Sequence, residues 1–209
     1  MPAAVRISKE NNTIRRSKMK VLGINGSPHK NGNTSLLIKT VFQELKNEGI
    51  ETELIHIAQK PVRGCKGCLK CVKNQNKQCV FDDDIMNECI GKMTAADGII
   101  LGSPTYFTDV TAEMKALIDR AGMVSIANGG IFKHKAGGSV VAVRRGGATH
   151  AFDTMNHFLH YMQMFLVGAS YWNMVYGWAP GEVNNDQEGI ENMKTLGKNM
   201  AYLLKKLSM

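Results

Sequence analysis

The cysteines carry the sharpest chemical signal in this sequence. Four of the five lie close together, with the spacing Cys65-x2-Cys68-x2-Cys71-x7-Cys79. Thiols three residues apart can wrap a compact metal centre, and the first three match the spacing of a bacterial ferredoxin run. Positive charge, which stabilises thiolates, surrounds them at Arg63, Lys66, Lys70, Lys73 and Lys77. This pattern predicts a [4Fe–4S] cluster held by the four cysteines.

Two alternatives remain for this cysteine run. One is zinc, although structural zinc sites usually present two separated Cys-x2–4-Cys pairs. The other is that the thiols are unligated or form a disulfide. The fifth cysteine, Cys89, falls on the inner face of a predicted helix and is interpreted as a buried, apolar thiol.

A loop rich in glycine and hydroxyl groups forms a second candidate site. It follows the apolar segment 21–25 and leads into a helical pattern that starts near Asn33. The first N–H groups of a helix lack intrahelical partners and carry positive partial charge, so a phosphate fits there. Ser27, Thr34 and Ser35 add hydroxyl donors. We interpret the loop as a cradle for one terminal phosphate; an ordinary strand-to-helix turn is the alternative.

Alternating strands and helices must position these residues. Strands are predicted at 21–25, 52–57, 99–101 and 139–143, with a fifth strand region at 166–176. Helices are predicted in the intervals, near 34–45, 82–97, 111–121 and 151–163, and at the end of the chain near 188–207. Continuous apolar strands that alternate with helices are typical of an α/β fold with a parallel sheet covered on both faces.

Three of the predicted strands end in loops of unusual composition. In an open parallel sheet, ligands bind at the carboxyl ends of the strands. The first strand leads into the phosphate cradle, and the third leads into Ser103-Pro104-Thr105-Tyr106-Phe107, which has two aromatic side chains. The fourth leads into Arg145-Gly146-Gly147, a cation followed by open backbone. Together these loops suit a flat heteroaromatic ligand with a phosphate tail, and FMN fits that description best.

These motifs resemble the NADPH-dependent FMN reductase branch of the flavodoxin-like superfamily. The similarity rests on Gly26–Ser35, Gly102–Phe107 and Val110–Arg120, and the cysteine run is similar to that of the iron-sulfur flavoproteins. The resemblance implies a flavodoxin-like three-layer sandwich with a five-stranded parallel sheet, and a homodimer or homotetramer. It places phosphate contacts at Ser27, Asn33, Thr34 and Ser35, and isoalloxazine contacts at Pro104, Thr105, Tyr106, Phe107, Arg145, Gly146 and Gly147.

The expected function is FMN-dependent electron transfer. The resemblance implies exchange of electrons between FMN, a [4Fe–4S] cluster and an external redox carrier such as ferredoxin, or a small-molecule acceptor. No catalytic side chain is predicted, because the flavin carries the chemistry. One alternative is a cluster-free NAD(P)H-dependent FMN or quinone reductase, in which NAD(P)H use rests on the resemblance alone. The other is a non-catalytic flavodoxin-like electron carrier.

The distribution of charge and the lengths of the apolar runs predict which partners and domains to expect. The formal net charge is +8, but residues 1–20 hold six basic residues against one acidic residue, and the rest of the chain holds 20 against 17. We therefore predict no nucleic-acid partner. No apolar run approaches the ~20 residues that span a bilayer, which predicts no membrane partner. Residues 1–18 are interpreted as a basic N-terminal arm, 19–209 as the FMN-binding domain, and 60–81 as a Cys-rich loop inserted into it.

Cysteine usage also predicts a compartment. The basic segment 1–18 lacks the apolar core of a secretory signal. Clustered thiols in a chain without such a signal are typical of a reducing environment. We therefore expect a cytoplasmic protein.

Overall fold

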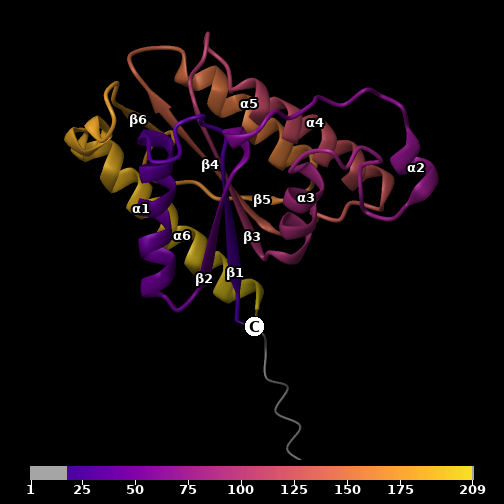
Figure 1. The fold of residues 1–209 in the computed structure, drawn as a ribbon. Coiled ribbons are helices and arrows are strands. Elements are labelled where there is room, and N and C mark those ends of the chain that lie inside the picture. The colour runs from indigo at the N-terminus through magenta and orange to yellow at the C-terminus, as the bar shows by residue number, and fades with distance from the viewer. Residues whose placement is uncertain (1–17, 209) are drawn as a thin grey trace, which may run out of the picture.

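Parallel strand pairing organises this fold. The computed structural model describes residues 18–208, and Figure 1 shows a twisted central sheet between two layers of helices. Four strands pair in the order β2-β1-β3-β4, and every pairing is parallel. They are β1 (Lys20–Asn25), β2 (Glu51–His56), β3 (Gly98–Pro104) and β4 (Ala136–Val143). All eight residues of β4 are buried, as expected for a strand covered on both faces.

Two short strands fill the fifth position of the sheet. β5 (Phe165–Leu166) pairs with the start of β4, and β6 (Met174–Tyr176) pairs with its end. The chain runs from Leu166 to Met174 while β4 advances only from Gly137 to Val141, so the extra residues leave the sheet between the two pairings. The prediction of a five-stranded parallel sheet is confirmed, and the fifth strand is broken into two pieces.

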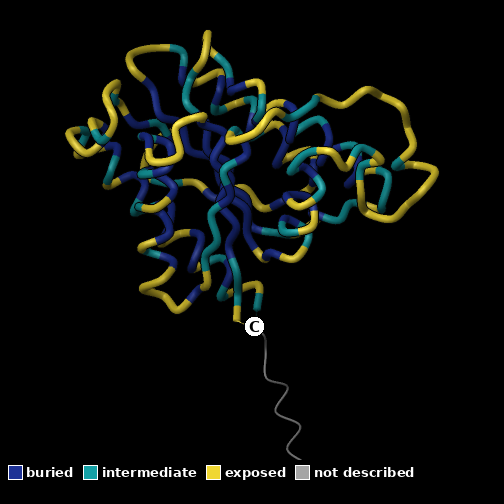
Figure 2. Tube along the Cα trace, in the orientation of Figure 1, coloured by how far each residue is buried: buried dark blue, intermediate teal, exposed yellow. Residues whose placement is uncertain are grey.

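Five long helices cover the two faces of the sheet. On one face lie α1 (Asn33–Asn47) and α6 (Gln187–Leu207), whose apolar sides form one buried cluster with the sheet. On the other lie α3 (Met86–Ala95), α4 (Ala112–Ala127) and α5 (Ala148–Tyr161), which form a second cluster. Figure 2 shows these buried layers in dark blue at the centre of the molecule. Three short helices connect them: η1 (Ile57–Gln59), α2 (Lys70–Asn74) and η2 (Glu182–Asn185).

Two helices have different bounds from those predicted from the sequence. The helix expected to open at Asp82 begins at Met86, and the Asp84 carboxylate accepts a hydrogen bond from the Met86 N–H at 3.1 Å. The helix predicted at 111–121 continues to Ala127 as α4, and the Thr111 hydroxyl caps it by accepting from the Met114 N–H. The loop 60–81 was expected to be irregular and contains the single turn of α2.

The predicted N-terminal arm lies outside the described residues, apart from Lys18. Between residues 18 and 208, no helix combines the length and the apolar character that crossing a bilayer requires.

Candidate functional site

The first two predicted loops meet at the carboxyl edge of the sheet. The Gly26 N–H donates to the Gly102 carbonyl at 2.8 Å, so the ends of β1 and β3 are held together. The Thr111 hydroxyl donates to the Gly26 carbonyl at 2.8 Å from the start of α4. A Cβ atom at Gly26 would lie 3.0 Å from the Met114 Cβ, so a side chain at this position would force the first loop or α4 to shift.

The second and third loops also touch. Gly147 has φ of 84°, in the left-handed region that favours glycine. A Cβ atom there would lie 3.1 Å from the Cα of Thr108 in the second loop. The Thr105 N–H donates to the Ala142 carbonyl at 3.0 Å, which ties the second loop to the end of β4. The three loops predicted from sequence to lie at one edge therefore form one continuous surface.

The start of α1 has open hydrogen-bonding capacity. Its N-cap residue, Gly32, provides no side-chain cap, and its first turn contains no acidic residue. Ser27 and Thr34 are buried beside it, and the Ser35 hydroxyl is fully buried without a hydrogen-bond partner among residues 18–208. Exposed N–H groups at a helix start and an unpaired hydroxyl are the features that a bound phosphate satisfies. The residues present therefore fit the phosphate of FMN.

Asn33 lies at the start of the same helix, but its side chain is engaged elsewhere. Its Nδ2 donates to the Ala179 carbonyl at 3.0 Å, and its Oδ1 accepts from the Gly181 N–H at 2.8 Å. Asn33 thus ties the segment 177–181, which follows β6, to the phosphate cradle. In this arrangement its side chain positions a neighbouring loop.

The segment 177–181 is a fourth loop at this edge, and our sequence reasoning did not assign it to the site. Arg144 stacks over the Trp178 ring at 4.5 Å, which joins the segment to the third loop. The Glu182 carboxylate accepts from the N–H groups of Trp178 and Ala179, at 2.5 and 2.7 Å, and holds the turn. The signal was present in the sequence, because a Gly- and Pro-containing turn directly follows the fifth strand region.

The second loop presents exposed aromatic side chains and an unpaired hydroxyl. Tyr106 is 45% exposed and Phe107 is fully exposed. Phe107 and Thr108 have φ of 48° and 71°, an uncommon conformation for residues with side chains that clusters at ligand sites. The Thr105 hydroxyl is buried without a partner among the described residues, while Pro104 is half-buried at the base of the loop. Exposed rings beside unsatisfied polar groups suit a flat polar ring system.

The third loop is the most open of the predicted contacts. Arg145 and Gly146 are exposed, and Gly147 is half-buried against the second loop. Beside it, an open groove of about 450 Å³ is lined by Arg144, Tyr176, Gly177, Trp178, Glu182, Asn185 and Asp186. The predicted isoalloxazine contacts therefore lie on one accessible surface, at the edge where the phosphate cradle also opens.

The four clustered cysteines form a separate site. Cys65, Cys68, Cys71 and Cys79 line a single small cavity together with Val80, Phe81, Met123, Val124 and Arg120. Cys65 and Cys68 are exposed, whereas Cys71 and Cys79 are half-buried. Among residues 18–208, no three Cys, His, Asp or Glu side chains are arranged to hold a single metal ion. The thiols share one cavity without converging on one point, and four thiols are the donor set of a [4Fe–4S] cluster.

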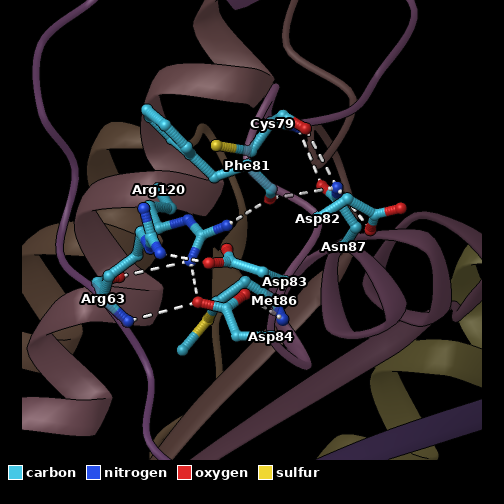
Figure 3. A network of polar contacts seen from close by, with 9 residues as sticks. All are labelled: Arg63, Cys79, Phe81, Asp82, Asp83, Asp84, Met86, Asn87 and Arg120. Carbon is cyan, nitrogen blue, oxygen red and sulfur yellow. Dashed lines mark hydrogen bonds and ion pairs between the residues drawn. The ribbon is translucent and has the colours of Figure 1, made fainter.

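A buried arginine closes the inner side of this cavity. Figure 3 shows Arg120, from α4, reaching toward the two ends of the Cys-rich loop. Its guanidinium forms an ion pair with Asp84 in which both side chains are almost fully buried. It also donates to the carbonyls of Arg63 at 3.2 Å and Phe81 at 2.7 Å. The Arg120 Nε is buried without a partner among the described residues, so this cation has one donor left beside the thiol cavity.

The ionisation of this network follows from the same contacts. Burial alone raises the pKa of the Asp84 carboxyl, but the hydrogen bond from Arg120 and those from the Arg63 and Met86 amides hold it below its usual range. Burial raises the pKa of the Cys71 thiol, and the nearby Cys79 and Cys65 raise it further. Asp84 therefore remains a carboxylate that neutralises Arg120 from the side away from the cysteines.

Asn87 fixes the backbone of the last cysteine. Its Oδ1 accepts from the Cys79 N–H at 2.8 Å, and its Nδ2 donates to the Cys79 carbonyl at 2.9 Å (Figure 3). Cys89, two residues further along α3, is fully buried, and burial raises its thiol pKa to about 12. The interpretation of Cys89 as a buried, apolar thiol is confirmed.

Comparison with known proteins decides the family. The profile of the NADPH-dependent FMN reductase family matches residues 19–179. An iron-sulfur flavoprotein of Methanocaldococcus jannaschii is 41% identical over 194 residues, which cover 90% of this chain and 98% of that protein. The chain belongs to the iron-sulfur flavoproteins of the NADPH-dependent FMN reductase family. An iron-sulfur flavoprotein of Methanosarcina thermophila is 34% identical and covers 89% of this chain and 95% of its own.

Solved structures agree on the fold of this iron-sulfur flavoprotein family member. A WrbA-like flavodoxin from Agrobacterium tumefaciens superposes with a TM-score of 0.61 at 15% identity, over 91% of this chain and 99% of that one. The predicted family and the flavodoxin-like fold class are confirmed. The individual contacts to FMN and iron stay predictions.

Proposed function

We propose that this chain, an FMN-dependent oxidoreductase by family, transfers electrons between FMN, a [4Fe–4S] cluster and an external carrier such as ferredoxin. The observation that carries the proposal is the single cavity lined by four cysteines beside a buried arginine. When bound, FMN supplies one- and two-electron chemistry and the cluster supplies one-electron chemistry. The protein contributes binding, orientation and electrostatics.

The residues at the sheet edge have separable tasks in this proposal. The N–H groups at the start of α1, with Ser27, Thr34 and Ser35, bind the phosphate. Asn33 supports the cradle by holding the segment 177–181. The second and third loops, with Pro104, Thr105, Tyr106, Phe107, Arg145, Gly146 and Gly147, border the isoalloxazine ring. The loop-to-loop contacts that fix the backbone at this edge support the assignment.

The Cys-rich loop binds the cluster through Cys65, Cys68, Cys71 and Cys79. Arg120, whose charge is paired with Asp84, lines the inner side of the cavity and offers its unpaired Nε–H as a hydrogen-bond donor to the thiolates that would hold the cluster. Asp84 and Asn87 hold the two ends of the loop, so the cysteine backbones keep their spacing. Clustered thiols that must stay reduced also support a cytoplasmic location.

The cofactor content of anaerobically purified protein tests this proposal. We expect FMN and about four irons per chain, the composition of one [4Fe–4S] cluster. Cys71→Ser should lose the iron and retain the FMN. The matched control is Cys89→Ser, because that buried thiol lies outside the cavity and should leave iron content unchanged. Protein that binds FMN but no iron after anaerobic reconstitution would contradict the cluster assignment.

A cluster-free NAD(P)H-dependent FMN or quinone reductase is the second candidate. It is favoured by the family description, which names NADPH as the reductant. Flavin absorbance separates the two candidates under anaerobic conditions. Rapid bleaching by NADPH alone supports the second candidate, whereas bleaching only by a reduced carrier supports the first.

We also propose that the chain forms a homodimer or homotetramer. Large aromatic side chains are exposed to solvent around β5 and β6, and an exposed apolar patch of this kind is typical of a protein interface. They are Tyr161, Tyr171, Trp172, Tyr176 and Trp178. Light scattering of the eluted protein should give a mass of two or four chains. A single-chain mass across the micromolar range would contradict this proposal.

A further inference from the structure

The Cys-rich loop exposes aliphatic side chains that the fold leaves uncovered. Leu69, Val72 and Val80 are 57%, 46% and 38% exposed. Leu69 and Val80 also line the cysteine cavity from its outer side. Figure 1 shows α2, which carries Val72, projecting on the side of the molecule opposite α1 and α6. An apolar patch on a projecting loop indicates a contact surface.

The same loop holds a local excess of positive charge. Residues 60–81 contain six Lys or Arg and no acidic residue, so the near balance of charge outside the N-terminal segment conceals one basic cluster. Lys66, Lys70, Lys73 and Lys77 are exposed, and none is in an ion pair within residues 18–208. Arg63, in contrast, is paired with Asp83. We call the four lysines together with Leu69, Val72 and Val80 the lysine face.

The arrangement of the lysine face favours a protein partner over a nucleic acid. Protein interfaces combine apolar side chains with charged ones, and this loop exposes both kinds. Single-stranded nucleic acid stacks its bases on exposed aromatic rings. The aromatic side chain of this loop, Phe81, is half-buried, and its ring is covered by Arg63 at 5.1 Å and Lys66 at 5.2 Å. The exposed apolar side chains of the lysine face are aliphatic.

Part of the lysine face also borders the cysteine cavity, at Lys66, Leu69 and Val80. Cys65 and Cys68 are exposed beside Leu69, so a partner seated on this face would approach the cysteine cavity more closely than one seated elsewhere. Small redox proteins exchange electrons through weak, small interfaces, and opposite charge accelerates their encounter. The complement of a lysine rim is a surface rich in carboxylates.

We infer that the lysine face is the docking surface for a small acidic electron-transfer protein. The inference rests on the proposed function, because the face gives access to the iron site and not to the FMN edge. Each encounter transfers one electron: the reduced carrier is oxidised by one electron and this protein is reduced by one. The lysines steer and orient the carrier, and the aliphatic side chains exclude water from the contact.

Charge reversal on α2 tests the inference. The probe is a reduced, acidic bacterial ferredoxin, mixed anaerobically with the FMN- and iron-loaded protein in a stopped-flow instrument. Lys70→Glu/Lys73→Glu should lower the second-order rate constant about tenfold or more at low ionic strength. Lys70→Gln/Lys73→Gln should lower it less. Added salt should slow the wild type and should not slow the reversed variant, because screening weakens attraction in one and repulsion in the other.

Matched controls isolate the face. Lys46→Glu/Lys198→Glu makes the same change in net charge on α1 and α6, where both lysines are exposed, and should leave the rate constant within about twofold. Reduction by dithionite should be unchanged in every variant. Iron and FMN contents are measured first, so loss of either cofactor is read as a failure of the proposed function and not of the docking surface.

Three results would overturn the inference. The first is loaded protein in which both α2 variants react with the ferredoxin as fast as wild type. The second is equal slowing by the control pair, which would assign the effect to net charge alone. The third is salt-sensitive binding of a single-stranded oligonucleotide, or of a second copy of this chain, that the α2 reversal abolishes while ferredoxin reduction is retained.

Discussion

The two cofactor regions are built in different ways. The FMN edge consists of loops that continue four strands and contact one another through backbone atoms, at Gly26–Gly102 and Gly147–Thr108. The Cys-rich loop leaves the sheet after β2 and is held at its two ends by side chains, chiefly Arg120 and Asn87. α4 connects the regions, since it begins beside the second loop and passes the cysteine cavity at Met123, about three turns later.

The FMN site therefore follows mainly from the fold, whereas the cysteine cavity depends on particular side chains. Any chain that forms this sheet brings the ends of β1, β3 and β4 to one edge, so the FMN site follows from topology. The cysteine cavity depends on a buried charge pair that topology does not require. Substitutions in the charge pair should therefore affect iron and stability, and substitutions in the loops should affect FMN.

The largest expected effect is at the buried ion pair. Asp84→Asn leaves Arg120 buried and unpaired, which costs about 3–5 kcal/mol for a pair of this kind. We expect a lower free energy of urea unfolding and loss of iron, with FMN retained under native conditions. The matched control is Asp119→Asn, which removes an exposed pair with Lys115 and should cost about 0.5 kcal/mol or less. Equal costs for the two variants would contradict the distinction between the regions.

The second effect is specific to the FMN edge. Ser35→Ala removes a buried hydroxyl that has no partner among the described residues, so the FMN-free protein should be as stable as wild type or more so. A hydrogen bond to a charged group contributes about 1.5–3 kcal/mol, so FMN should bind roughly ten- to a hundredfold more weakly. Ser125→Ala, which removes another unpaired buried hydroxyl on α4, should leave the FMN dissociation constant unchanged. Flavin fluorescence titration measures both.

Backbone conformation gives a third, smaller effect. Gly147→Ala puts a side chain at a positive φ and 3.1 Å from the Thr108 Cα, which should destabilise the protein by about 1–2 kcal/mol and weaken FMN binding. The neighbouring Gly146→Ala meets nothing within 4 Å and should change stability by about 0.5 kcal/mol or less. If both variants behave alike, the contact between the second and third loops is not needed.

The smallest expected effect is the change, at acid pH, in the stability difference between wild type and Asp84→Asn. The pKa of Asp84 is lowered in the folded protein, so the carboxylate contributes stability above its unfolded pKa of about 3.9, and this contribution is lost as the pH falls through the folded value. The stability gap between wild type and Asp84→Asn should therefore be constant near neutrality and narrow below about pH 4. Unfolding curves at a series of pH values test this, and a gap that narrows between pH 6 and 8 would contradict it.

The FMN edge could be predicted from the sequence more completely than the cysteine cavity. Apolar strands followed by Gly26–Ser35 and Ser103–Phe107 predicted the FMN edge, because composition at a strand end maps directly to the sheet edge. The spacing of the cysteines predicted the iron site, but the role of Arg120 was not recognised. Its partners Asp84 and Phe81 are more than 30 residues away along the chain, and no local pattern reports such a pairing.

Two features at the FMN edge were also missed for physical reasons. The family resemblance predicts a phosphate contact at Asn33, but the side-chain bonds of Asn33 to Ala179 and Gly181, more than 140 residues later, were not predicted. The break between β5 and β6 depends on where an edge strand re-joins β4, which periodicity does not encode. Both are consequences of long-range contacts in the C-terminal third of the chain.

The most direct test of the account is the difference in affinity between FMN and riboflavin, which lacks the phosphate. If the start of α1 binds the phosphate, wild type should bind FMN at least a hundredfold more tightly, because several charge-assisted hydrogen bonds of about 1.5–3 kcal/mol are lost with it. Ser35→Ala should weaken FMN binding and leave riboflavin binding unchanged. Equal affinities for the two flavins in wild type, or equal penalties for both in Ser35→Ala, would contradict the phosphate cradle.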